Sequence, residues 1–222
     1  MHNNRDKNKI NNNTVVYEKQ LIAADKAIMR GDLDKALISA QKGFELGLTL
    51  GRNEAAGQYL FCLNELGRFD ETLQAAERFF SNTKNDDEAA LANMLCAMLA
   101  VGTVQAERGM KLLKKLDLAS ASGWRRRFTG FNYNPVQTSL VFNAALIFYH
   151  AGKKDEALRL VKDVMQHIIF FIDTETGGTR ELSPEVAETI SEFLHLIKES
   201  DELGLLEGED VFQELAEITV NS

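Results

Sequence analysis

Three heptapeptides share one pattern along the chain: GDLDKAL at 31–37, GRFDETL at 67–73 and GKKDEAL at 152–158. Each lies between two stretches in which apolar residues recur at the three- and four-residue spacing of a helix. The glycine can end the first helix in a left-handed conformation. The aspartate three positions later lies in the first turn of the next helix, where its charge suits the helix dipole. The pattern therefore predicts pairs of helices joined by tight turns.

A fourth, weaker copy reads VGTVQAE at 101–107, where we expect Thr103 to serve as the N-cap of the following helix. The glycines of the four copies are separated by 36, 35 and 50 residues. Two intervals of nearly equal length indicate a repeated unit, and the longer third interval indicates an insertion near residues 119–134. The chain has only two prolines in 222 residues, so few positions interrupt a helix. We predict an all-α fold.

This pattern resembles the tetratricopeptide repeat, a helix-turn-helix unit of about 34 residues, over residues 14–172. The resemblance is best in the second helix of each pair, where a small residue is followed four positions later by another small or apolar residue. The first helix keeps only the size and polarity of the family motif, and the closing proline of the family is absent. The resemblance implies a right-handed α-solenoid of three to four helix pairs. The matching second-helix positions are Ala36 and Ala40, Thr72 and Ala76, and Ala157 and Val161.

The two ends of the chain differ from the repeats. Residues 1–13 are rich in Asn and hold few apolar side chains, so we predict a disordered arm there. Residues 173–222 hold 14 acidic and two basic residues, whereas residues 1–172 hold 19 acidic and 23 basic residues. A Ser-Pro pair at 183–184 signals the start of one helix, and apolar spacing predicts another from about residue 210. We expect these acidic helices to cap the apolar end of the array.

Several functional classes are disfavoured by the sequence. No stretch reaches the roughly 18 apolar residues of a membrane helix, and the first residues lack the apolar core of a secretory signal, so we expect a cytoplasmic protein without membrane insertion. Cys62 and Cys96 have no CxxC spacing, and the four histidines show no paired metal-binding spacing. The Gly-x-Ser-x-Gly motif and Gly-rich phosphate loops are also absent. We predict that the protein is not an enzyme and uses no cofactor or metal.

The resemblance also implies a binding surface, because the first helices of tetratricopeptide repeats line a groove that holds a partner protein. The residues carried over to that groove are mostly apolar, which suits an amphipathic helix or an extended peptide with apolar anchors. The alternative is that these residues pack against the next repeat or the C-terminal helices, as apolar stripes usually do. The expected groove residues are Leu21, Asp25, Ile28, Phe61, Asn64, Leu99, Phe142, Leu146 and Tyr149.

The insertion contains the run Trp124, Arg125, Arg126, Arg127 and Phe128. Arginine binds phosphate and carboxylate through two parallel hydrogen bonds and stacks on aromatic rings, so this run can hold an acidic peptide, a phosphate or a nucleic acid. The alternative is a solvated loop whose aromatic residues cover the seam between repeats. An acidic chain with an isoelectric point near 5.1 gives little support to nucleic-acid binding.

We hypothesise that the protein is a non-catalytic protein-protein interaction module, either an adaptor, a scaffold or a dedicated chaperone. A second hypothesis is an anion-recognising or nucleic-acid-linked regulator that acts through the run from Trp124 to Phe128. A third is a structural subunit whose apolar face is buried in a homo-oligomer. The charge division further suggests that the acidic C-terminal helices dock on the basic insertion of the same chain and occlude it.

Overall fold

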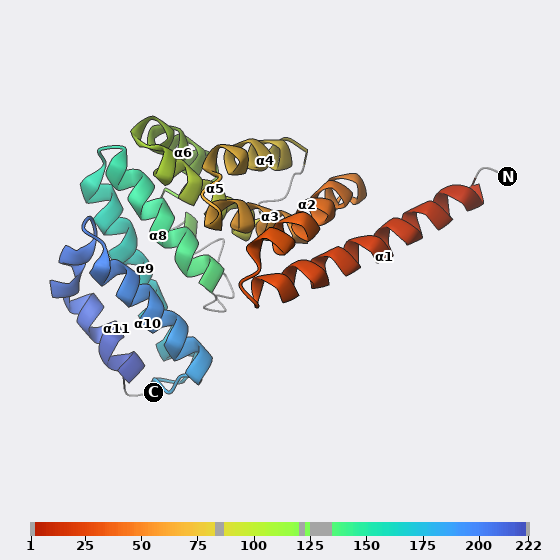
Figure 1. Ribbon diagram of the computed structural model, residues 1–222. Coiled ribbons are helices and arrows are strands. Elements are labelled where there is room, and N and C mark those ends of the chain that lie inside the picture. The colour runs from red at the N-terminus through yellow and green to blue at the C-terminus, as the bar shows by residue number, and fades with distance from the viewer. Residues whose placement is uncertain (1–2, 83–86, 120–122, 125–134, 221–222) are drawn as a thin grey trace. The chain divides into compact units, whose positions relative to one another are not determined.

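The computed structural model describes residues 3–82, 87–119, 123–124 and 135–220, and these residues form helices and short connections without a strand (Figure 1). The predicted all-α class is therefore confirmed. The chain divides into two compact units, residues 1–101 and residues 102–222. Each unit is described by itself below.

The first unit is built from antiparallel helix pairs. α1 packs against α2 and α3 against α4, while α3 also packs against α2, and α5 packs against both α3 and α4. The first helix of each pair thus contacts the pair that precedes it, which is the contact pattern of stacked repeats. The helices are α1 (Asn3–Ile28), α2 (Leu33–Leu50), α3 (Glu54–Glu65), α4 (Phe69–Asn82) and α5 (Glu88–Val101).

The second unit contains the fourth pair and the acidic C-terminal segment. α8 packs against α9, and α6 packs against α8. α10 packs against α8, and α11 packs against α9 and α10, so the acidic segment is helical and lies on the pair before it. The elements are α6 (Thr103–Lys115), α8 (Pro135–His150), α9 (Lys154–Glu175), α10 (Pro184–Glu199), the 3₁₀ turn η1 (Gly204–Gly208) and α11 (Asp210–Val220).

The three heptapeptides fold in the same way. Gly31, Gly67 and Gly152 have φ angles of 69°, 69° and 78°, in the left-handed region. In each turn the glycine N–H donates to the carbonyl three residues earlier, and the next N–H donates to the carbonyl five residues earlier, at 2.8–3.0 Å. These two bonds satisfy carbonyls that the end of the first helix leaves free. The predicted helix-ending role of these glycines is confirmed.

The fourth copy of the pattern folds differently. Gly102 has a φ angle of 122° and is itself the N-cap of α6, because its carbonyl accepts hydrogen bonds from the N–H groups of Gln105 and Ala106. Thr103 is the first residue of α6, so the prediction that Thr103 is the N-cap is wrong. The connection between α5 and α6 consists of Gly102 alone. This short connection leaves no room for the turn seen in the other three copies.

Small residues allow the helices of a pair to approach closely. Ala36, Thr72 and Ala157 near the starts of the second helices are fully buried, as the repeat pattern predicts. The contact between α3 and α5 is tighter still, because a Cβ atom at Gly57 would lie 2.6 Å from the Cβ atom of Ala89. Glycine at this position therefore sets the distance between these two helices.

The segment for which we predict a disordered arm is mostly included in α1, which begins at Asn3. Residues 3–28 contain neither glycine nor proline, so no residue there interrupts the helix. α1 has 26 residues and α2 has 18, and α1 extends past the end of α2 (Figure 1).

Tyr17 joins the first helix to the second pair. Its hydroxyl donates to Oε2 of Glu54 at 2.7 Å and accepts a hydrogen bond from the N–H of Ala55 at 3.3 Å. Burial, together with the hydrogen bond to Glu54, raises the pKa of Tyr17. The same hydrogen bond lowers the pKa of Glu54, because it favours the ionised carboxylate.

The close approach of α3 and α5 predicts that Gly57→Ala destabilises the first unit. The extra methyl group overlaps Ala89, and overpacking of this kind costs about 1–3 kcal/mol of unfolding free energy. Without that contact, the same change inside a helix would raise stability by roughly 1 kcal/mol. Urea unfolding therefore distinguishes the two effects. A lower unfolding free energy indicates the clash with Ala89, and a higher unfolding free energy indicates that the clash is absent. Adding Ala89→Gly to Gly57→Ala should restore part of the loss.

The Tyr17 bridge predicts that Tyr17→Phe lowers the unfolding free energy by about 1–2 kcal/mol at pH 7, since it removes a hydrogen bond to a carboxylate. The folded pKa of Glu54 is lowered, so this stabilisation is present above the unfolded pKa, about 4.3, and is lost as the pH falls through the folded pKa. Urea unfolding at pH 7 and pH 3 should show the difference between the proteins shrinking at low pH.

Tyr59→Phe is the matched control for that experiment. Tyr59 is half-buried against Phe44, and its hydroxyl has no hydrogen-bond partner among the described residues. We expect this variant to unfold like the wild type at both pH values. An equal loss of stability in the two variants would show that the Tyr17 hydrogen bonds contribute nothing specific.

Candidate protein-interaction site

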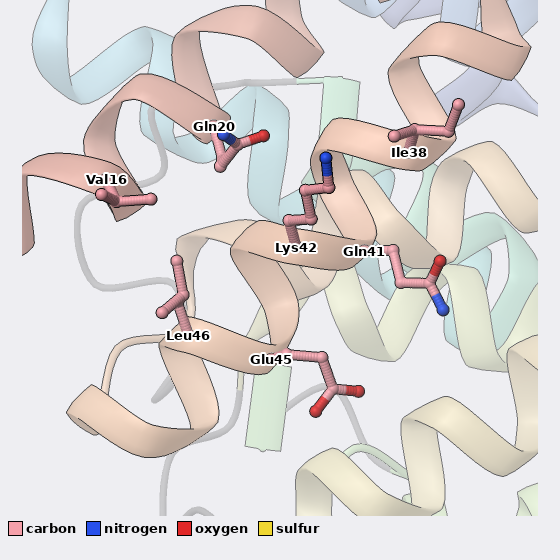
Figure 2. Close-up of a pocket in the computed structure, with 7 residues that line it drawn as sticks. All are labelled: Val16, Gln20, Ile38, Gln41, Lys42, Glu45 and Leu46. Carbon is pink, nitrogen blue, oxygen red and sulfur yellow. The ribbon is translucent and has the colours of Figure 1, made fainter. Parts of the chain in front are cut away.

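An open groove runs between α1 and α2 on the surface of the first unit and encloses about 410 Å³. Val16 is 44% exposed and Ile38 is 54% exposed, so two large apolar side chains of the groove face solvent. Figure 2 shows that Val16 and Gln20 come from α1 and that the other lining residues come from α2. The lining residues are Val16, Gln20, Ile38, Gln41, Lys42, Glu45 and Leu46.

The position of the groove follows from which face of α2 is buried. The buried stripe of α2 contains Ala36, Ala40, Gly43 and Phe44. Ile38 lies two residues from Ala36 and two from Ala40, about 200° around the helix from each. The groove is therefore formed by the side of α2 that points away from its buried stripe.

Several acidic and basic side chains of α1 and α2 differ in whether they have partners within the first unit. Three carboxylates bind partners that follow α2 in the chain: Glu18 pairs with Arg52 of the α2–α3 connection at 3.4 Å, Asp25 accepts a hydrogen bond from Gln58 of α3, and Glu45 pairs with Arg78 of α4. Lys42 and Glu45 both line the groove, but Glu45 is bound by Arg78, whereas Lys42 has no ion-pair partner among the described residues. The exposed Lys19 and Lys26 of α1 likewise form no ion pair in that part of the chain. The groove side of the first pair thus carries an excess of positive charge.

Part of the predicted first-helix surface packs against the core of the first unit. Ile28 and Phe61 are half-buried and pack against a cluster that includes Ala24 and Ala36. Leu99 is also half-buried. Because small residues bring α1, α2 and α3 close together, the larger side chains beside them fill the seam. Their contacts agree with the alternative that these residues pack against neighbouring repeats.

Polar residues of the same predicted surface link the first helices to one another. Nε2 of Gln58 donates to a carboxylate oxygen of Asp25 and lies 3.5 Å from the carbonyl oxygen of Leu21. Nδ2 of Asn64 donates to the carbonyl and the side-chain oxygen of Asn93, at 2.9 and 3.0 Å. Asp25 and Asn64 therefore already have partners within the first unit.

The remaining predicted groove residues lie on α8 in the second unit. Phe142, Leu146 and Tyr149 are all half-buried. The ammonium nitrogen of Lys154 lies 4.8 Å from the centre of the Tyr149 ring, a cation–π contact. Since the two units are described separately, the prediction that these residues share one groove with those of the first unit stays a prediction.

Of the run from Trp124 to Phe128 in the basic insertion, the structure describes only Trp124. This side chain is 1% exposed, and its Nε1–H donates to the carbonyl oxygen of Leu118 at 2.8 Å. Trp124 is therefore a core residue and presents no aromatic surface to a ligand. Arg125, Arg126, Arg127 and Phe128 lie outside the described residues, so their predicted role in binding anions stays a prediction.

Many acidic residues of the C-terminal segment pair with cations of their own unit. The Arg180 guanidinium hydrogen-bonds to Asp173 and lowers the pKa of that carboxyl below its usual range. The predicted docking of the acidic helices on the basic insertion falls on residues outside the described part of the chain. The observed ion pairs are Arg180 with Asp173 and Glu214, Lys162 with Glu209, and Lys198 with Glu207, and Nε2 of His150 lies 3.2 Å from a carboxylate oxygen of Glu202.

Sequence reasoning missed the groove between α1 and α2. The resemblance assigns binding to the first helices, and it therefore passes over Ile38 and Lys42 on the second helix. A signal was present in the sequence, because an isoleucine at position 38 lies outside the repeated small-residue stripe of α2. A large apolar residue off the buried stripe of a helix marks a surface that is incompletely covered.

The described residues contain no cluster of three His, Cys, Asp or Glu side chains arranged to hold a metal ion. Cys62 is buried and Cys96 is partly buried, and both are free thiols. None of the helices that the structure describes has the length and hydropathy needed to cross a membrane.

The chain was compared with protein-family models, with curated proteins and with solved structures. None of the three comparisons gives a match.

Proposed function

We propose that this chain is a non-catalytic protein-interaction module, a right-handed tetratricopeptide-like solenoid that acts as an adaptor, scaffold or dedicated chaperone. The repeated turns support the solenoid, since Gly31, Gly67 and Gly152 end three helices with the same two hydrogen bonds. The contacts of α3 and α5 with the pairs that precede them also support it. Repeat arrays of this kind bury one face of each helix pair and offer the remaining surface to partners.

The observation that carries the proposal is the open groove on α1 and α2. It combines exposed apolar side chains, Val16 and Ile38, with polar residues at its edges, Gln20, Gln41 and Lys42. Apolar side chains surrounded by a polar rim are the arrangement found in protein-binding sites. The site that we favour is therefore this groove, in place of the first-helix residues that are engaged in the core.

We expect the double variant Val16→Ser/Ile38→Ser to lose a bound protein partner. Both residues are substantially exposed, so the change should leave the helix content unchanged in circular dichroism while it removes the apolar contacts of the partner. Tagged wild type and variant would be used to capture proteins from a lysate of the source cells, with identification by mass spectrometry. Recovery of the partner should fall at least about tenfold, which corresponds to roughly 1.4 kcal/mol.

The matched control is Val104→Ser/Phe170→Ser, which removes two exposed apolar residues from the second unit. This control should recover the partner as well as the wild type does. Equal recovery by the groove variant would exclude the groove as the site. If recovery were also lost at high salt, the result would favour the second hypothesis, binding through the basic insertion.

A further inference from the structure

Lys42 and Arg78 occupy equivalent positions in the repeat. Lys42 follows Gly31 by 11 residues, and Arg78 follows Gly67 by 11 residues. The turn glycines of both pairs have the same backbone conformation, and the second helix starts two residues after each glycine. The environment of Arg78 in α4 therefore indicates what a cation at position 42 of α2 can bind.

Arg78 binds the second helix of the preceding pair. Its two terminal nitrogens contact the two carboxylate oxygens of Glu45 in α2, the longer of these distances being 2.6 Å. The guanidinium carbon also lies 5.7 Å from the centre of the Phe44 ring. One cation thus binds a carboxylate and the adjacent aromatic residue of α2.

Lys42 faces the groove without a carboxylate to bind. Glu45, one turn away, is held by Arg78, and Asp34 lies more than two turns away at the start of α2. Lys19 follows Val16 by three residues, which places it on the adjoining side of α1. The groove therefore offers an apolar floor beside two cations that are not neutralised within the described residues.

The apolar floor of the groove and its two lysines indicate which kind of molecule the groove binds. A second copy bound through the same face would bring no free carboxylate to Lys42, because Glu45, the carboxylate of that face, is already bound by Arg78. A free anion would leave Val16, Ile38 and Leu46 uncovered. A helix with an apolar stripe and flanking carboxylates satisfies both parts of the groove, and α2 itself presents this combination to Arg78 through Phe44 and Glu45.

We propose that the groove between α1 and α2 binds an acidic amphipathic helix of the partner protein. The apolar stripe of that helix covers Val16, Ile38 and Leu46, and a carboxylate beside the stripe pairs with Lys42. This inference rests on the proposed function and adds the chemistry of the partner segment. It describes binding of the helix-in-groove type, with specificity set by the sign of the flanking charges.

Two synthetic helical peptides of 18 residues test the proposal. Both carry the same stripe of Leu and Ala, and the two rows beside the stripe are Glu in one peptide and Lys in the other. Fluorescence anisotropy at moderate salt should give a dissociation constant roughly five- to tenfold lower for the Glu peptide, the effect expected of two exposed ion pairs. The variant Lys19→Glu/Lys42→Glu should reverse this preference.

The matched control is Lys114→Glu/Lys115→Glu, which changes the net charge equally through two exposed lysines of α6. It should keep the preference of the wild type for the Glu peptide. Loss of that preference in the control would show that net charge alone selects the peptide, and the proposal would be overturned.

Three further results of these experiments would each overturn the acidic-helix proposal. Equal affinity for the two peptides, or binding of neither, would overturn the acidic-helix proposal. A dimer of the chain alone in sedimentation that Lys19→Glu/Lys42→Glu dissociates would identify a second copy as the occupant, and it would overturn the proposal too. In all these cases the proposed function is judged separately by whether Val16→Ser/Ile38→Ser loses the captured partner.

Discussion

The left-handed backbone at Gly31, Gly67 and Gly152 is the constraint on which the rest of the fold depends. A residue with a Cβ atom adopts this conformation only at a cost, and glycine adopts it freely. The conformation lets the chain reverse within three or four residues, so the next helix lies antiparallel to the one before it. Small residues at fixed distances after the glycine, such as Ala36 and Thr72, then meet the first helix at close range.

Close packing within the pairs decides which surfaces stay open. Because the small residues of α2 form one stripe, larger residues elsewhere on the helix, such as Ile38 and Leu46, remain outside the tight contact. The carboxylates Glu18 and Glu45 bind Arg52 and Arg78, which follow α2 in the chain, and Lys42 in the groove therefore has no carboxylate partner among the described residues. The apolar surface and the unneutralised charge therefore arise from the same packing, and together they form the candidate site.

The turns, the helix pairs and the buried small residues could be predicted from the sequence, because each depends on local spacing and on the conformational freedom of glycine. The fourth turn could not be predicted in detail. The pattern VGTVQAE contains a suitable N-cap residue in Thr103, but Gly102 takes that position since a single residue connects the two helices. The helical start of α1 was also missed, because composition indicates what a segment can bury and gives no position at which a helix must end.

The candidate site was predicted less well than the fold. A family resemblance assigns roles by position, whereas burial depends on the size of neighbouring side chains. Phe61 and Ile28 are therefore half-buried against the core cluster that contains Ala24. The three arginines that follow Trp124 in the sequence led to the prediction that Trp124 belongs to an exposed basic run. Its burial and its hydrogen bond to the carbonyl of Leu118 instead make it part of the core. The groove between α1 and α2 depends on which helix faces remain uncovered, and the sequence indicates this only through Ile38, a large apolar residue outside the small-residue stripe of α2.

A direct contact between the groove and a partner is the central claim, and photo-crosslinking tests it most directly. Benzoylphenylalanine placed at position 38, in the groove, or at position 170, an exposed apolar position of the second unit, would be irradiated in a lysate of the source cells. The account predicts one covalent adduct from position 38 and none from position 170. An adduct from position 170 with none from position 38 would contradict it.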